Sequence, residues 1–199
     1  ETLHILPHWN WDGREGETTP VFVYTNYNSA ELFINGKSQG IQKKSMDSKL
    51  NRYRLMWMDV KYSPGTMKVV AYNDKGEAAK EKIVVTSGKP HHIELEADRD
   101  TISTNGEDIS FVTAIVFDKN GNPCPTASNR LNFEVNGNGK FLAACNGDAT
   151  SLEIFHKPTM KLFNGKLVVL VQAASNEGDI ELRVCGDGLV ENKIKIYTK

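Results

Sequence analysis

The chain has few cysteines, and none of them lie close together. Its 199 residues contain three, Cys124, Cys145 and Cys185, with no C-x-x-C pair among them. Structural zinc sites usually need closely spaced ligand pairs, so this spacing argues against one. An odd number of cysteines allows at most one disulfide. We interpret the three as small buried apolar side chains.

An excess of charge and a long apolar run are also missing. The 24 Lys and Arg nearly balance the 25 Asp and Glu, which leaves a formal net charge of −1. This balance gives no reason to expect nucleic acid or an anionic membrane as a partner. No apolar run approaches the roughly 20 residues that cross a bilayer. The first residue is not Met and no signal-peptide pattern follows it, so we expect a fragment or processed product.

Helical periodicity is nearly absent, and short strand patterns recur in its place. In the first half, Val21–Thr25 reads as a strand, Asn35-Gly36 as a hairpin turn, and 52–60 as a further strand. In the second half, Ile93–Ala97 alternates apolar and acidic residues, as expected for a half-buried strand.

The stretch "SGKP" at 87–90 separates two series of about seven strands each. We therefore predict an all-β protein of two tandem immunoglobulin-like β-sandwich domains, residues 1–88 and 89–199. Each has the length of roughly 100 residues that such a sandwich needs.

Recognisable catalytic and metal-binding patterns are missing as well. No G-x-S-x-G, H-E-x-x-H or phosphate-binding glycine loop occurs. Most Asp and Glu lie at turns or on outward strand faces, where they serve solubility. We expect His91 and His92 to point to opposite faces of one strand, which prevents joint chelation, and His156 is isolated. The sequence thus predicts no metal, no cofactor and no catalytic residue.

The stretch "PHWNW" is the densest cluster of chemically informative residues. It contains His8, Trp9, Asn10 and Trp11. In an extended chain the two indoles would lie on one side, where they could stack on a sugar, plug the sandwich or contact a neighbouring domain. We favour packing. If the rings form a domain seam, replacing both with Ala should barely change the stability of this chain alone.

A second candidate is the long connection from Cys145 to Lys166. Long connections in small sandwiches are either functional or cover a sheet edge. We name Asn146 and Asp148 as its candidate functional residues. Folding of this loop over an open sheet edge is an equally weighted alternative.

Several of these stretches resemble the region that follows the catalytic barrel in glycoside hydrolase family 2 enzymes, most closely the β-galactosidase-like members of Bacteroidetes. In the first half the likeness runs through "LHILPHWNW", "VFVYTNYNSAELFINGKSQG" and "VVAYNDKGEAAKEKIVVTSGKP". In the second half it runs through "NGDATSLEIF" and "FNGKLVVLVQAA" and is similar to the invasin-type repeat of the same enzymes. Where the family loop commonly reads Gly-Asn-Gly-Asp-Pro, this chain has Cys145 and Ala149.

The resemblance implies a parent enzyme that hydrolyses β-galactosides with two Glu on a (β/α)₈ barrel. Such a barrel needs roughly 250 residues and would lie upstream, so no catalytic residue carries over to this chain. The partner implied is that barrel. Oligo- or polysaccharide is a further possible partner, and the parent is expected to be periplasmic, cell-surface or secreted. A carbohydrate-binding module and a piece of an immunoglobulin-repeat adhesin stay open as alternatives.

Overall fold

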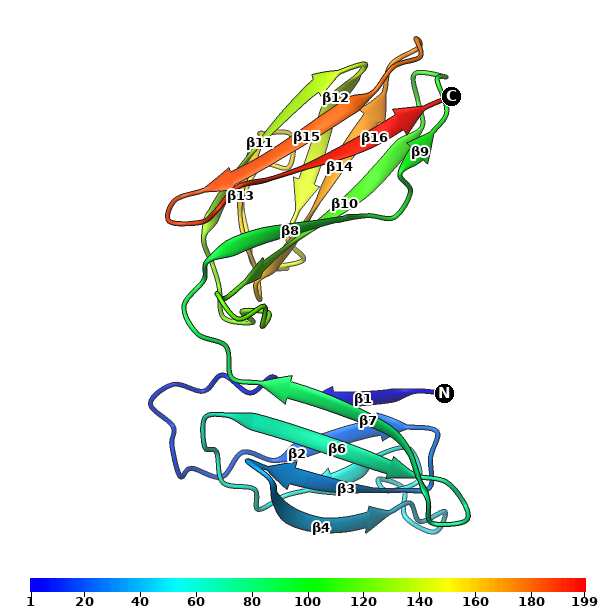
Figure 1. The fold of residues 1–199 in the computed structure, drawn as a ribbon, viewed down its shortest axis with the longest axis vertical. Helices are drawn as coiled ribbons and strands as arrows, with labels where there is room; N and C mark the ends of the chain where they lie inside the picture. The colour runs from blue at the N-terminus through cyan, green and yellow to red at the C-terminus, as the bar shows by residue number, and fades with distance from the viewer. The chain divides into compact units, whose positions relative to one another are not determined.

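A computed structural model describes all 199 residues, and every regular element in it is a β-strand (Figure 1). No helix is present that could serve as a membrane span. The chain divides into two compact units, Glu1–Thr86 (unit 1) and Ser87–Lys199 (unit 2). The division lies two residues before the boundary predicted from the sequence. The predicted all-β class and tandem sandwich architecture are confirmed.

Unit 1 is a sandwich of two antiparallel sheets. One sheet has the order β1-β2-β5, and the other the order β4-β3-β6-β7. The strands are β1 (Leu3–Leu6), β2 (Val21–Thr25), β3 (Ser29–Ile34), β4 (Lys37–Lys43), β5 (Leu55–Trp57), β6 (Thr66–Tyr72) and β7 (Ala78–Val85).

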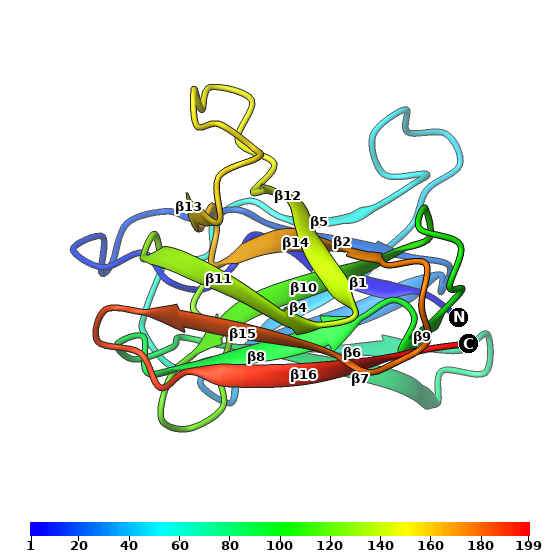
Figure 2. The same cartoon turned by 90° about the horizontal axis from the view of Figure 1, so that it is seen from above.

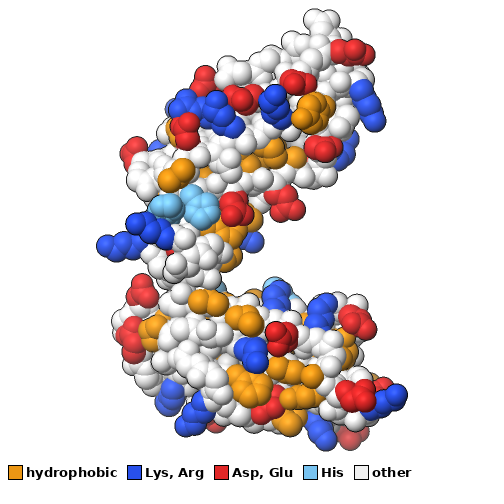
Figure 3. Space-filling view, in the orientation of Figure 1, with side chains coloured by type: hydrophobic (Ala, Val, Ile, Leu, Met, Phe, Trp, Pro, Cys, Tyr) orange, Lys and Arg blue, Asp and Glu red, His pale blue; other side chains and the backbone are white.

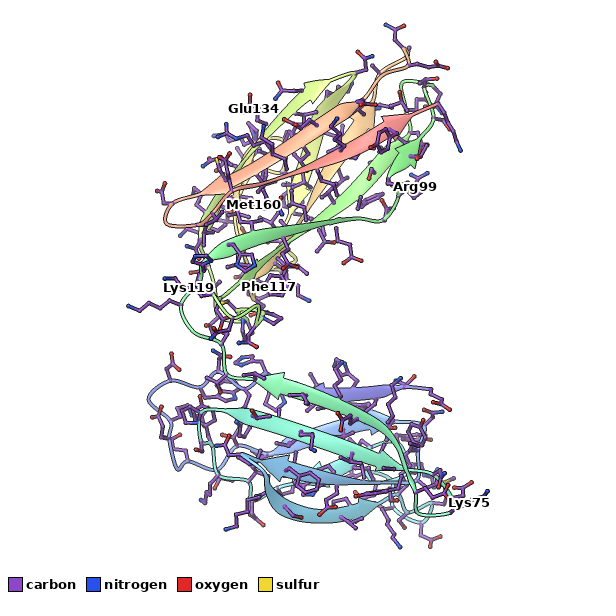
Figure 4. All side chains as sticks on the ribbon, in the orientation of Figure 1. Lys75, Arg99, Phe117, Lys119, Glu134 and Met160 are labelled. Carbon is purple, nitrogen blue, oxygen red and sulfur yellow. The ribbon has the colours of Figure 1, made fainter.

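Turn chemistry accounts for the hairpins of unit 1. Asn35 and Gly36 join β3 to β4 with φ values of 49° and 80°, the positive angles that a tight hairpin of this type needs. Between β6 and β7 the side-chain oxygen of Asn73 accepts hydrogen bonds from the backbone of Lys75 and Glu77. Figure 4 labels Lys75 in that turn.

The strand predicted over 52–60 is much shorter than expected. Only Leu55–Trp57 pair with β2. The Arg52 amide instead donates to the Ser48 carbonyl in a turn, and the Val60 carbonyl accepts from Thr19, outside any ladder. Local hydrogen bonds thus take the backbone groups that a longer strand would have used.

Unit 2 is a larger sandwich, with sheets ordered β12-β14-β10-β8 and β13-β11-β15-β16-β9. The strands are β8 (His92–Ala97), β9 (Thr101–Ile102), β10 (Ile109–Phe117), β11 (Arg130–Gly137), β12 (Gly139–Cys145), β13 (Thr159–Lys161), β14 (Lys166–Ala173), β15 (Ile180–Gly186) and β16 (Asn192–Thr198). The sequence patterns missed β9 and β13, because two or three residues show no period.

Strict alternation builds the core of unit 2. Ile180, Leu182 and Val184 of β15 are fully buried, and the residues between them face outward. Met160 of the short strand β13 is also buried in this core (Figure 4). On the face of unit 2 presented in Figure 3, acidic and basic side chains are interspersed. This mixture fits a solvated surface without a single-sign field.

A buried carboxylate organises the start of unit 2. Asp118 follows β10 and is 2% exposed. Figure 4 labels its chain neighbours Phe117 and Lys119. Its carboxylate accepts hydrogen bonds from the amides of Gly88 (2.7 Å), Asn120 (2.8 Å) and Asn122 (2.9 Å). Burial raises the pKa of Asp118, but the hydrogen bonds from Gly88, Asn122 and Asn120 outweigh it and lower the pKa to about 2.

This lowered pKa makes the free energy of unfolding of unit 2 depend on pH. The lowered value means that Asp118 stabilises the fold above its unfolded pKa near 3.8 and loses this contribution as pH falls toward 2. Wild type should therefore exceed Asp118→Asn in free energy of unfolding at pH 6, and most of the carboxylate's share of that difference, up to about 2 kcal/mol, should be lost by pH 2.

Urea denaturation followed by far-ultraviolet circular dichroism measures this difference. All three Trp lie in unit 1, so their fluorescence marks the unit 1 transition separately. A difference between the two proteins that stays constant from pH 6 to pH 2 would contradict the assignment.

Candidate functional site

The predicted aromatic segment begins where β1 ends. After Leu6 the chain leaves the sheet through a cis peptide bond to Pro7, and residues 7–11 form no strand. Both indoles contact the core of unit 1, but Trp9 is enclosed in it and Trp11 is only partly buried against it.

Trp9 belongs to the core of unit 1. Its side chain is 0% exposed and meets the Tyr62 ring edge-on, with centroids 5.1 Å apart. The indole Nε1 donates to the Ser63 carbonyl at 2.9 Å, and the Trp9 carbonyl accepts from the Thr86 hydroxyl. With its ring enclosed and its N–H satisfied, Trp9 offers no face to a sugar or to another domain.

Trp11 lies at the surface and forms a compact stack. Its ring is half-buried and stacks on His8, with centroids 4.4 Å apart and planes at 24°. The Trp11 Nε1 donates to the His8 carbonyl at 3.0 Å. The Arg14 guanidinium lies 5.3 Å from the Trp11 centroid and also binds Glu17. One aromatic surface therefore exists here, made by Trp11 and His8.

The protonation state of His8 follows from its contacts. Burial lowers the pKa of His8, which favours the neutral ring at neutral pH. The Asn10 amide donates to the His8 Nδ1 at 3.2 Å, so Nδ1 is the acceptor and Nε2 carries the proton. Asn10 itself is 7% exposed and is part of the segment's internal structure.

The second predicted site is a loop that its own side chains hold in place. Asn146 Nδ2 donates to the Lys161 carbonyl at 2.9 Å, and its side-chain oxygen accepts from the Asp148 amide at 3.0 Å. The Asp148 carboxylate accepts from the hydroxyl and amide of Thr150, which lowers its pKa. Asn146 and Asp148 thus lie together, and their polar groups are used within the loop.

The same loop covers a sheet edge. The Ala144 amide of the edge strand β12 donates to the Phe155 carbonyl at 2.9 Å, and β13 pairs with β11. Beyond these contacts the yellow connection from β12 to β13 extends away from the strands (Figure 2). Leu152 in this connection is 98% exposed. Edge covering, the alternative weighed from the sequence, therefore occurs, while a binding role for the loop stays a prediction.

The histidine and cysteine side chains do not lie close enough together to form a metal centre. No group of three or more His, Cys, Asp or Glu side chains is arranged to hold an ion. His91 precedes β8, so strand alternation does not separate it from His92. Their rings lie edge-on with centroids 5.5 Å apart, which corrects the expectation of opposite faces. All three cysteines are free thiols, and Cys124 is buried.

Comparisons with protein families match both units. Residues 93–195 match the glycoside hydrolase family 2 C-terminal domain 5, and residues 16–80 match a domain of unknown function, DUF4982. The first match covers more than half of the chain. The chain belongs to the glycoside hydrolase family 2 C-terminal domains.

Individual relatives agree with this assignment. The chain is 39% identical over 197 residues to the β-galactosidase BoGH2A of Bacteroides ovatus, covering 98% of the chain but 22% of that protein. A putative β-glucuronidase of Formosa agariphila is 28% identical over 73% of the chain and 14% of its own length. A β-glycosidase structure from Bacteroides vulgatus superposes with a TM-score of 0.89 at 34% identity, over 98% of the chain and 24% of its own. The chain thus spans less than a quarter of the length of each of these three proteins.

The burial of Trp9 changes the expected effect of mutating the segment. Trp9→Ala should destabilise unit 1 by about 3–5 kcal/mol, because it leaves a cavity and removes the hydrogen bond to the Ser63 carbonyl. Trp11→Ala, the matched control, should cost much less because its ring is half-exposed. This replaces the expectation that losing both indoles is nearly neutral. Chemical denaturation followed by tryptophan fluorescence measures unit 1, and equal losses for the two variants would contradict the assignment.

Proposed function

We propose that this chain is the non-catalytic pair of accessory sandwiches of a family 2 glycoside hydrolase of the β-galactosidase type. The observation that carries the proposal is the 39% identity to BoGH2A over 98% of the chain, although the chain corresponds to 22% of that enzyme. A barrel of roughly 250 residues cannot be formed by two sandwiches of this size. The catalytic domain therefore lies elsewhere in the longer protein.

The electrostatics of the chain support a scaffold role. A retaining glycosidase needs two carboxyl groups about 5 Å apart, one with a raised pKa so that it acts as the acid. Every carboxyl group here with a shifted pKa has it lowered, including Asp118, Asp148 and Glu153. Hydrogen bonds from backbone and side-chain donors keep these groups ionised. Carboxylates of this kind fix loops and do not donate protons.

The scaffold proposal predicts how activity divides between proteins. The purified chain should not cleave chromogenic β-galactosides, and the full-length protein should. Parallel assays with β-glucuronides decide the sugar, because a putative β-glucuronidase is also among the relatives. Turnover by the chain alone, abolished by replacing one Asp or Glu, would overturn the proposal.

A second candidate function is saccharide contact at the His8–Trp11 stack. It is favoured by one observation: the stack is half-exposed and flanked by Arg14, whose guanidinium can donate to hydroxyl groups. A single ring gives weak binding, so a Kd near 1 mM, or about −4 kcal/mol, is the affinity to expect.

Isothermal titration with galacto-oligosaccharides tests this candidate. Binding should be lost in Trp11→Ala and kept in Tyr53→Ala. Tyr53 is a good control because it is an exposed ring of the same unit and also lies under a guanidinium, that of Arg52 at 5.8 Å. If the unmodified chain does not bind the sugar, or if both variants lose binding, a specific sugar contact at Trp11 is refuted.

A further inference from the structure

Three connections of unit 1 meet at one end of its sandwich. They are the β2–β3 turn, the start of the β4–β5 connection and the β6–β7 turn (Figure 1). Together they surround a surface hollow of about 530 Å³, which we call the three-connection hollow. This volume lies within the roughly 300–1,000 Å³ that small-molecule sites occupy. The lining residues are Asn28, Ser29, Lys43, Lys44, Met46, Asn73, Asp74 and Gly76.

Hydrogen bonds between the connections fix the walls of the hollow. Asn28 Nδ2 donates to the Asp74 carboxylate at 2.8 Å, which joins the β2–β3 and β6–β7 turns. The Lys44 amide donates to the Asn28 carbonyl at 2.9 Å, which joins the β4–β5 connection to the same turn. Asn73 accepts hydrogen bonds inside the β6–β7 turn and holds its shape. The positions of Asn28 and Asp74 are therefore set by the fold itself.

Other polar groups of the lining have no partner within the protein. Lys43 and Asp74 carry opposite charges, yet neither takes part in an ion pair. Asn28 binds one oxygen of Asp74, so the second oxygen is able to accept from a ligand. The Ser29 hydroxyl also makes no hydrogen bond to the protein. An ammonium donates and a carboxylate accepts, so a ligand between them must offer both acceptors and donors.

The charge of the hollow favours an anionic ligand. Two ammonium groups, those of Lys43 and Lys44, line it against the single carboxylate of Asp74. Lys44 Nζ donates to the Thr25 carbonyl, and burial lowers the pKa of Lys44. An anion beside a partly desolvated ammonium stabilises its charged form. A ligand carboxylate meets this need, and Asp74 is then left to accept from ligand hydroxyls.

We propose that the three-connection hollow binds an acidic sugar unit, a hexuronic acid. The sugar carboxylate pairs with Lys43 and Lys44, and the sugar hydroxyls donate to Asp74. The C–H groups of the ring contact Met46, which is 71% exposed. This inference goes beyond the scaffold role, which assigns no ligand to unit 1. It requires no glycosidase activity in the longer protein.

A second hollow, of about 520 Å³ in unit 2, lacks this combination of groups. It also contains two ammonium groups, those of Lys89 and Lys119. Its one carboxylate belongs to Asp118, which is 2% exposed and already accepts from three backbone amides. Sugar hydroxyls therefore find no open carboxylate oxygen there, in contrast to Asp74.

The His8–Trp11 stack lies elsewhere in unit 1. Trp9, which anchors the segment of the stack, is hydrogen-bonded to Ser63 and Thr86. These two residues lie at the ends of β6 and β7 that are remote from the β6–β7 turn. Residue-specific measurements therefore distinguish binding at the hollow from binding at the stack.

Amide chemical shifts of the isotope-labelled chain test the proposal. Sodium D-galacturonate should shift the amides of Asn28, Lys44 and Asp74, with a Kd of about 1 mM, as expected for one sugar unit. D-Galactose carries a CH₂OH group in place of the carboxylate and should bind at least about tenfold more weakly, because it cannot form the charge-assisted hydrogen bonds. Equal binding of the two sugars would overturn the proposal.

Asp74→Asn separates sugar recognition from simple attraction of an anion. The change removes a negative charge together with the open carboxylate oxygen. If Asp74 accepts sugar hydroxyls, the variant should bind D-galacturonate at least about fivefold more weakly. Tighter binding by the variant, or equal shifts of the unmodified chain with sodium acetate, would overturn the proposal in favour of a site for any anion.

Lysine variants complete the test. Lys43→Gln should weaken D-galacturonate binding at least about fivefold, and Lys43→Arg, which keeps the charge, should retain it. Lys75→Gln is the matched control, because Lys75 lies in the β6–β7 turn but not in the lining (Figure 4). Lys43 and Lys75 are both exposed, and unchanged amide shifts in the rest of unit 1 verify folding. Equal losses in Lys43→Gln and Lys75→Gln, or shifts confined to residues around Trp11, would contradict the assignment.

Discussion

The enclosed indole of Trp9 joins the first residues of unit 1 to its last. Its N–H binds the Ser63 carbonyl before β6, its ring packs on Tyr62, and its backbone carbonyl accepts from Thr86 after β7. A segment without strand pairing, residues 7–11, would otherwise have little to fix it. The buried indole anchors the segment, and Trp11, two residues further on, stacks on His8.

In unit 2 a buried carboxylate holds segments together, as the buried Trp9 indole does in unit 1. Asp118 gathers the amides of Gly88, Asn120 and Asn122 around one carboxylate, and it is almost fully buried. A buried charge is tolerated only when its hydrogen-bonding capacity is filled. Gly88 is distant in sequence from the β10 turn, so this carboxylate fixes the start of unit 2 to the body of the same unit. Unit 1 is thus held by a contact between its first and last segments, and unit 2 by a contact between its start and its body.

Regular alternation made the sandwich fold predictable, and the loss of alternation explains the errors. Residues such as Ile180, Leu182 and Val184 reveal a strand from sequence, because burial on one face imposes a period of two. The hairpin at Asn35-Gly36 was predictable because few residues tolerate positive φ at both positions. Packing of the indoles was favoured from the sequence, but which of the two is enclosed depends on how residues 7–11 leave β1. The predicted opposite orientation of His91 and His92 was wrong for a related reason, because His91 lies one residue outside the strand that was expected to contain it. Asn146 and Asp148 could be singled out by composition, but their hydrogen bonds within the loop depend on a fold that composition does not give.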